Sequence, residues 1–281
     1  MRIIWSGLLF SALEYAFMQN ALLGAVFISI ICGVIGSLVV SNKMVFIAGG
    51  IAHSVYGGVG IAAFFGISIM LGAASFSVLC ALALAYMLLY AKERLDSIIG
   101  SLWAFGMALG IILVELTPGY SKDFMGYLFG SILSVTAFDL WIMSIFALFL
   151  VMFVVANYRL ILGFSYDSEF ARLKGIPINI LSIMLMLLIA LGVVISMQSV
   201  GIILIVALLS IPAYCALVLT KSLGMMMILS SIISFVSMLC GLYFAYNFDL
   251  QAGASIVLSL TLLSFMLSGF YYFRTYAFKS Y

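Results

Sequence analysis

Charged residues are scarce in this chain, because only 7% of its 281 residues are Asp, Glu, Lys or Arg while 67% are hydrophobic. A soluble domain of this size needs a more polar surface, so the composition excludes that class. Apolar runs of roughly 18 or more residues recur from end to end, and in a bilayer such runs form helices, which satisfy their own backbone groups. The sequence therefore predicts an all-α, polytopic membrane protein with a single transmembrane domain over residues 1–281.

Motifs for covalent or nucleotide chemistry are also missing from the sequence. The 4 cysteines stand singly in apolar runs without a Cys-x-x-Cys pair, so buried thiols are expected rather than disulfides or a zinc knuckle. No GxxxxGK[ST] stretch that could hold a nucleotide phosphate occurs. We therefore expect no enzyme activity, no permanently bound cofactor and no nucleic-acid partner, and any ATP hydrolysis would belong to another polypeptide.

Cutting the chain at polar clusters and at Gly and Pro residues gives nine apolar segments that could cross a membrane. Residues 124–135 are too few to cross and are predicted to be re-entrant, and the N-terminal stretch MRIIWSGLLFSALEY is predicted to be an interfacial helix. Eight or ten crossings are the alternatives. The predicted spans are 16–40, 45–66, 71–91, 97–116, 138–160, 178–196, 200–220, 224–246 and 253–273.

Basic residues mark the cytoplasmic side of a membrane protein, and most of those in this chain fall on one side of the predicted spans. The N-terminus is therefore predicted outside and the C-terminus inside. The outer side carries an excess of acids, which would attract cations to the entrance, although any one of them could instead cap a helix. The basic inner residues are Lys43, Lys92, Arg94, Arg159, Arg172, Lys174, Lys221, Arg274 and Lys279, and the outer acids are Glu14, Glu115, Asp123, Asp139 and Asp249.

The single histidine, His53, lies about 12 Å along its predicted span, near the middle of the membrane. An ionisable group at that depth is costly unless it faces a cavity or a partner, and neutral imidazole is a good ligand for zinc, manganese or iron(II). Gly49, Gly57 and Gly60 share its helical face and would let an ion or another helix approach. The sequence predicts a metal contact at His53, with a buried, hydrogen-bonded histidine as the alternative.

The most charged stretch of the chain follows the predicted span 138–160. Its charges punctuate a short amphipathic helix that Gly175 and Pro177 would end. Such a helix on the cytoplasmic side could dock onto a soluble partner, and an ordinary solvated loop is the alternative. The residues predicted to couple the chain to a partner are Asp167, Glu169, Arg172, Lys174 and Gly175.

Four parts of the chain carry a likeness to a known family: EYAFMQNALL, AHSVYGGVG, YLFGSIL with SYDSEFARLKGIP, and VGIILIVALLSIPAYCALVL with FDLQAGASIVL. These stretches resemble the permease subunits of the bacterial ABC importers for zinc, manganese and iron(II). The resemblance implies a homodimer in the cytoplasmic membrane, with two ATP-binding subunits inside, a metal-loaded solute-binding protein outside and lipids around it. It implies import of a divalent metal ion, zinc first, driven by the separate ATPase. A stand-alone secondary carrier or channel for cations and a family member moving another solute are the alternatives.

The resemblance also implies roles for single residues. His53 matches a histidine that contacts metal in the translocation path, residues 167–177 match the segment that docks on the ATPase, and Asp249 matches the acid before the last helix. Pro212 falls in a helix motif of the family and is predicted to kink a span, where neighbouring groups or a water-lined path would satisfy the freed backbone groups.

One departure from the family concerns the metal contact itself. The family usually has an aspartate four residues before the histidine, and this chain has Gly49 there. A carboxylate from another helix would have to serve, and Glu115 and Asp123 are the candidates. Asp249 could contact metal or could simply be the N-cap of the final helix.

Overall fold

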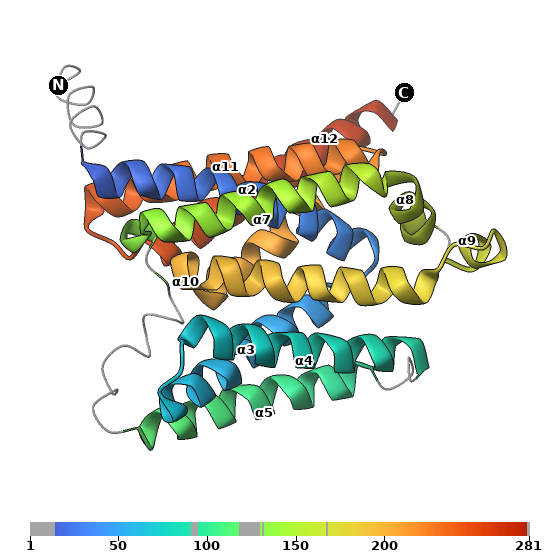
Figure 1. The fold of residues 1–281 in the computed structure, drawn as a ribbon. Helices are drawn as coiled ribbons and strands as arrows, with labels where there is room; N and C mark the ends of the chain where they lie inside the picture. Colours follow the sequence, from blue (N-terminus) through green and yellow to red (C-terminus); the bar gives the residue numbers. More distant parts are fainter. Residues whose placement is uncertain (1–14, 91–94, 118–129, 131, 167, 280–281) are drawn as a thin grey trace, which may run out of the picture.

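The computed structural model describes residues 15–90, 95–117, 130, 132–166 and 168–279 of the chain (Figure 1). These residues form helices and no strand, which confirms the predicted all-α class. The elements are α2 (Ala16–Ser41), α3 (Val45–Phe65), α4 (Ile69–Tyr90), α5 (Leu95–Glu115), the short 3-10 helix η2 (Ile132–Ser134), α7 (Ala137–Ala156), α8 (Tyr158–Tyr166), α9 (Ser168–Leu173), α10 (Ile178–Leu219), α11 (Leu223–Phe248) and α12 (Ala252–Lys279).

Eight of these helices are long and apolar enough to cross a membrane, and seven of them match single predicted spans. The predicted span 138–160 was too long, because α7 ends at Ala156 with Asn157 as its C-cap. Arg159 therefore lies in the separate helix α8. The two predicted spans 178–196 and 200–220 both fall within one element, α10.

Helix α10 is folded back on itself at Gly201, whose backbone is not helical (φ 77°, ψ 162°). A straight helix of 42 residues would separate its ends by about 63 Å. Instead, Ser182 near its start and Thr220 just past its end both line cavities that Lys43 also lines. The segments 178–200 and 202–219, called the first and second arm here, are therefore antiparallel. The eight candidate spans of the described residues are therefore compatible with the predicted nine crossings when each arm counts as one.

The break in α10 lies at Gly201 and not at Pro212, where the sequence predicted a kink. The backbone stays helical through Pro212, which is buried in the second arm. A proline removes one helical hydrogen bond, but packing on neighbouring helices can hold the helix on course. The positive φ of Gly201 is not helical and therefore interrupts the helix, and glycine is the residue that adopts such a φ without steric cost.

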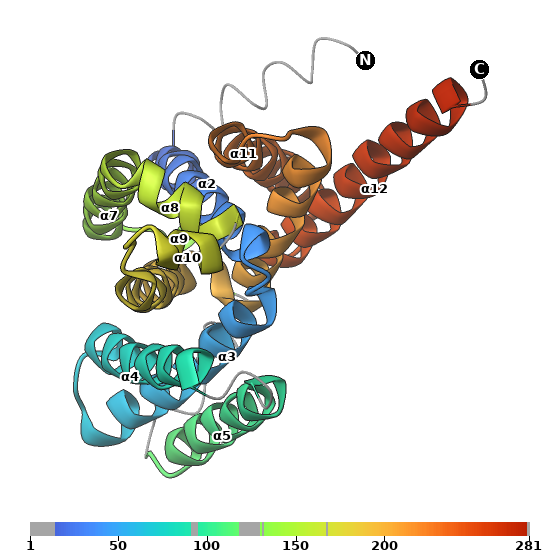
Figure 2. The same ribbon diagram turned by 90° about the vertical axis from the view of Figure 1, so that its right-hand side faces the viewer.

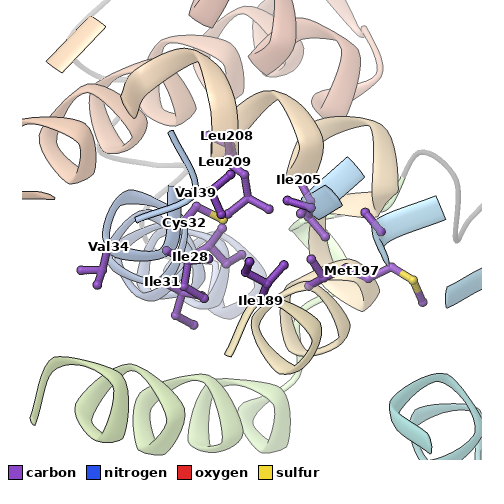
Figure 3. Close-up of a cluster of buried hydrophobic side chains, with 14 of the residues drawn as sticks. Ile28, Ile31, Cys32, Val34, Val39, Ile189, Met197, Ile205, Leu208 and Leu209 are labelled. Atoms are coloured by element: carbon purple, nitrogen blue, oxygen red, sulfur yellow. The ribbon is translucent and has the colours of Figure 1, made fainter. Parts of the chain in front are cut away.

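Both arms of α10 pack against α2, which lies inside the bundle. Figure 3 shows Ile189 of the first arm and Leu208 and Leu209 of the second beside Ile28 and Cys32 of α2. Small residues on α2 permit close approach: a Cβ at Gly36 would meet the Leu209 carbonyl group of the second arm, and one at Gly33 would meet the backbone of Ser231 on α11. Three of the cysteines, Cys32, Cys80 and Cys215, are buried as expected, whereas Cys240 is exposed.

Helices α3, α4 and α5 form a second group beside the first, as the end-on view in Figure 2 shows, and α12 extends away from both. Helices α3 and α5 contact each other through glycines. A Cβ at Gly60 would lie 2.6 Å from the Gly110 Cα atom, and one at Gly106 would lie 2.7 Å from the Ser54 Cα atom. Because these contacts follow the same order along both helices, α3 and α5 run parallel.

One end of the bundle gathers basic residues, in agreement with the predicted orientation. The turn with Lys43, the end of α8 and the turn with Lys221 together line one cavity, and α8 and α9 lie at that end (Figure 1). The opposite end holds the end of α5, the start of α7 and the end of α11. By the excess of basic residues, the first end is expected to be the cytoplasmic one, and this orientation stays a prediction.

The predicted re-entrant piece 124–135 is described at Gly130 and from Ile132 onward, where it forms η2. Residues 124–129 lie outside the described residues. The same holds for residues 1–14 of the predicted interfacial helix. Gly130 has a positive φ of 62° and contacts the backbone of Val200 and Gly201. The Asn20 side chain donates a hydrogen bond to the Val135 carbonyl (3.2 Å). These contacts place the segment between the start of α2 and the break in α10.

Candidate functional site

His53 lies near the middle of α3 and is half-buried against α5. Its imidazole stacks on the Trp103 indole, with ring centroids 4.1 Å apart and ring planes 10° apart. The Nδ1 atom is buried and makes no hydrogen bond within the described part of the chain. A hydrogen bond from Nδ1 is therefore not what holds the ring, and the choice between a metal contact and a structural histidine stays a prediction.

An open space lies one helical turn before His53. Gly49 is buried, yet an ideal Cβ placed on it would have no atom within 4 Å. Histidine side chains in helices lean toward the preceding turn, so the imidazole of His53 leans toward this space. A side chain larger than hydrogen would therefore fit at position 49.

The other predicted metal ligands lie apart from His53. Because α5 runs parallel to α3, Glu115 lies about 18 Å beyond Trp103 along the helix axis and is exposed at the outer end. Asp249 is exposed and is the left-handed C-cap of α11 (φ 52°, ψ 43°), so the alternative role as N-cap of α12 is wrong. Asp123 lies outside the described residues. Where the chain is described, no three His, Cys, Asp or Glu side chains come together as a metal site.

One outer acid has a structural role of the kind considered for all of them. The Asp139 carboxylate accepts hydrogen bonds from the backbone N–H of Thr136 (3.0 Å) and from its hydroxyl (2.7 Å). The Thr136 hydroxyl accepts one in return from the Asp139 N–H, which completes a capping box at the start of α7.

Gly57 and Gly60 are explained by helix packing. A Cβ at Gly57 would lie 2.9 Å from the Phe76 ring of α4, and Gly60 contacts Gly110. A role for these glycines, or for Pro212, in a translocation path therefore stays a prediction, whereas Gly49 alone of the predicted path glycines borders an open space.

The predicted coupling segment forms helix α9 at the cytoplasmic end. Gly175 ends it with φ 78°, and the N–H groups of Gly175 and Ile176 return hydrogen bonds to Arg172 and Ala171 (3.0 and 3.1 Å). Lys174 Nζ lies 4.7 Å from the centroid of the Phe170 ring. Asp167 lies outside the described residues, and Glu169 is exposed.

Two apolar side chains on α9 face outward among these charges. Phe170 is 55% exposed and Leu173 is 86% exposed, while Ala171 is the buried residue that holds the helix to the bundle. Exposed apolar side chains on a short helix outside the membrane are typical of an interface with another protein.

Comparison with known proteins identifies the group to which this arrangement belongs. The model of the ABC 3 transport family matches residues 14–271. The chain belongs to the ABC 3 transport family. It is thus a multi-pass transport permease of the cytoplasmic membrane, as predicted.

Members of the ABC 3 family with named functions are similar over nearly the whole chain. The manganese transport system membrane protein MntC of Halalkalibacterium halodurans is 37% identical over 88% of this chain and 84% of its own length. The manganese import system permease protein ScaB of Streptococcus gordonii is 34% identical over 92% of both. The structure of PsaBC from Streptococcus pneumoniae in complex with Fab superposes with a TM-score of 0.82 at 33% identity, over 91% of this chain and 94% of that one.

Two features of the ABC 3 permease site escaped prediction from the sequence. The stacking partner Trp103 lies on a different helix, and its register against α3 follows from the glycine contacts between them. The outward direction of Phe170 and Leu173 depends on how α9 rests on the bundle. The tryptophan within a predicted span was the available signal for the stack on His53. The apolar pair inside a charged loop was the available signal for the exposed side chains of α9.

Proposed function

We propose that this chain is the permease subunit of an ATP-driven importer of divalent transition metal ions, working as a homodimer. Two separate ATP-binding subunits would dock on the cytoplasmic end, and an extracytoplasmic metal-binding protein would deliver the ion from outside. The observation that carries the proposal is the lone His53 near the middle of α3, with an open space beside Gly49 one turn before it, in a chain of the ABC 3 family.

The site supports passage rather than retention of the ion. A single imidazole with water in the neighbouring space replaces only part of the hydration shell, so the ion can enter and leave. Energy for net import must then come from outside the membrane chain. Family membership favours the ATP-driven importer over the stand-alone carrier or channel, and uptake that stops when the ATPase subunit is inactivated would support this choice.

Two observations bear on which metal ion the permease carries. Two relatives carry manganese in their names, which supports manganese. Imidazole without a neighbouring carboxylate suits zinc or iron(II) better than manganese, which prefers oxygen ligands, and Gly49 removes the carboxylate. We propose the class of divalent transition metals as cargo and test manganese and zinc side by side.

Gly49→Asp is expected to lower the half-saturating concentration for manganese uptake several-fold and to change that for zinc less. The open space accepts the new carboxylate, which adds an oxygen ligand one turn from His53. Competitive uptake of radioactive manganese and zinc in cells measures the shift. Gly49→Ala fills the same space without a ligand, and an equal shift in that variant would contradict the explanation.

The double change Phe170→Asp and Leu173→Asp is expected to prevent co-purification of the ATPase with the permease. Both side chains are exposed on α9, so the change should remove an apolar contact without disturbing the bundle. Affinity purification of the tagged permease, followed by detection of the ATPase, measures the effect.

Leu250→Asp is the control, because Leu250 is as exposed as Phe170 (56% against 55%) but lies next to Asp249 at the opposite end of the bundle. It should leave the ATPase bound. If the α9 variant still retained the ATPase, α9 would not be the docking helix, and if no variant or wild type bound an ATPase, the carrier would be the better explanation.

A further inference from the structure

The indole of Trp103 is fixed by contacts on several sides. Its Nε1–H donates to the Met107 sulfur (3.0 Å) one turn further along α5. The Phe46 ring of α3 lies 6.5 Å from it at a tilt of 59°. Together with the His53 stack, these contacts set both the position and the plane of the indole.

The stack leaves His53 one way to bind a metal ion. A metal binds imidazole in the ring plane through a nitrogen lone pair, and the indole covers a face of the ring rather than its edge. The Nδ1 edge is buried. Since the residue is half-buried and Nδ1 is a covered nitrogen, we infer that an ion would bind at Nε2.

Metal-binding histidines are usually oriented by a hydrogen bond from their second nitrogen to a carboxylate, a carbonyl group or water. His53 has no such bond from Nδ1 within the described residues. Something else must hold the ring, because an imidazole free to rotate would present Nε2 only part of the time. The nearly parallel stack on Trp103 is the contact that restricts this rotation.

We propose that Trp103 is a positioning residue for metal passage, which holds the His53 imidazole so that Nε2 faces the space beside Gly49. The electron-rich face of the indole also favours the positive charge that the imidazole gains when it binds a cation. This inference rests on the proposed function of His53 as a metal contact. In this chain, the face of the Trp103 indole on the parallel helix α5 would orient the imidazole, a role that a hydrogen bond usually has.

Uptake by Trp103 variants tests the proposal in whole transporter complexes. Trp103→Leu is expected to raise the half-saturating metal concentration roughly tenfold, comparable to loss of an orienting partner elsewhere, while Trp103→Phe, which keeps a ring to stack on, restores most of it. Folding is followed in the same variants by yield and ATPase co-purification. Equal defects in the Leu and Phe variants, or wild-type uptake by Trp103→Leu, would overturn the positioning role.

A spectroscopic readout reports on the pair without transport. The chain has 3 tryptophans, so the full-length variant Trp5→Phe with Trp141→Phe keeps Trp103 as its single reporter. Cobalt(II) is expected to quench this fluorescence, and adding His53→Ala is expected to abolish the quenching. Quenching that persists without His53 would overturn the proposed contact between the ion and the stacked pair.

The variants of His53 and Trp103 separate the proposed metal contact from the proposed positioning role. If His53→Ala leaves uptake and quenching unchanged, the proposed metal contact itself is wrong. If His53→Ala abolishes both but Trp103→Leu changes neither the half-saturating concentration nor the maximal rate, the metal contact stands and the positioning role of Trp103 is wrong.

Discussion

Gly130→Ala is expected to destabilise the chain by about 2–5 kcal/mol, from a left-handed backbone that disfavours alanine and from overlap with a packed neighbour. A Cβ at Gly130 would fall on the backbone of Val200 and Gly201 at the break in α10. Backbone atoms cannot change rotamer to make room, so either the segment or the break must move. Thermal unfolding in detergent, followed by size-exclusion chromatography, measures the loss.

Gly100→Ala is the control for this change. Gly100 lies within α5, and a Cβ there would have no neighbour within 4 Å. The same methyl group should therefore leave the midpoint of unfolding unchanged or raise it slightly, because alanine favours a helix over glycine by about 1 kcal/mol. A Gly130→Ala protein that unfolds like the wild type would show that the contact with Gly201 does not bear on stability.

His53→Ala is expected to reduce metal uptake about 100-fold, the upper end of what loss of an orienting partner costs a metal site. The reason is that His53 is the one histidine of the chain and has no neighbouring cluster of metal-binding side chains among the described residues to replace it. Initial rates of manganese and zinc uptake measure the effect. His53→Gln, which keeps bulk against Trp103 but has no imidazole nitrogen, should lose uptake as well.

Assembly separates a transport defect from a folding defect in these variants. Both should co-purify with the ATPase as the wild type does, because α9 lies at the cytoplasmic end, away from the middle of α3 (Figure 1). Cys240→Ser, at an exposed position on α11, should leave uptake unchanged. Wild-type uptake by His53→Ala would remove the imidazole from the mechanism.

The spans and the orientation could be predicted from the sequence because they depend on local composition. Apolar length predicts a crossing wherever it occurs, and the basic turns with Lys43 and Lys221 indicate the same side without knowledge of neighbouring helices. The short charged helix before Gly175 was predictable for the same reason, since its end signal lies in the segment itself.

The break in α10 and the partner of His53 could not be predicted in this way. Proline is the stronger local signal for a kink, but Pro212 lies in a packed arm that stays helical, while Gly201 lies against Gly130, a residue far away in the sequence. Gly57 and Gly60 likewise fit two explanations until α5 is placed beside them. Such features depend on which helices become neighbours.

The glycine contacts between α3 and α5 bear on how the site would behave during a transport cycle. Backbone atoms of the two helices lie close together at Gly60 and Gly110 and again at Ser54 and Gly106, so the helices are in contact at two levels along their length. Because of this close packing, we expect the two helices to move together. His53 and Trp103 would then keep their stack in every state, and access to the ion would alternate by movement of the surrounding helices past an unchanged ligand.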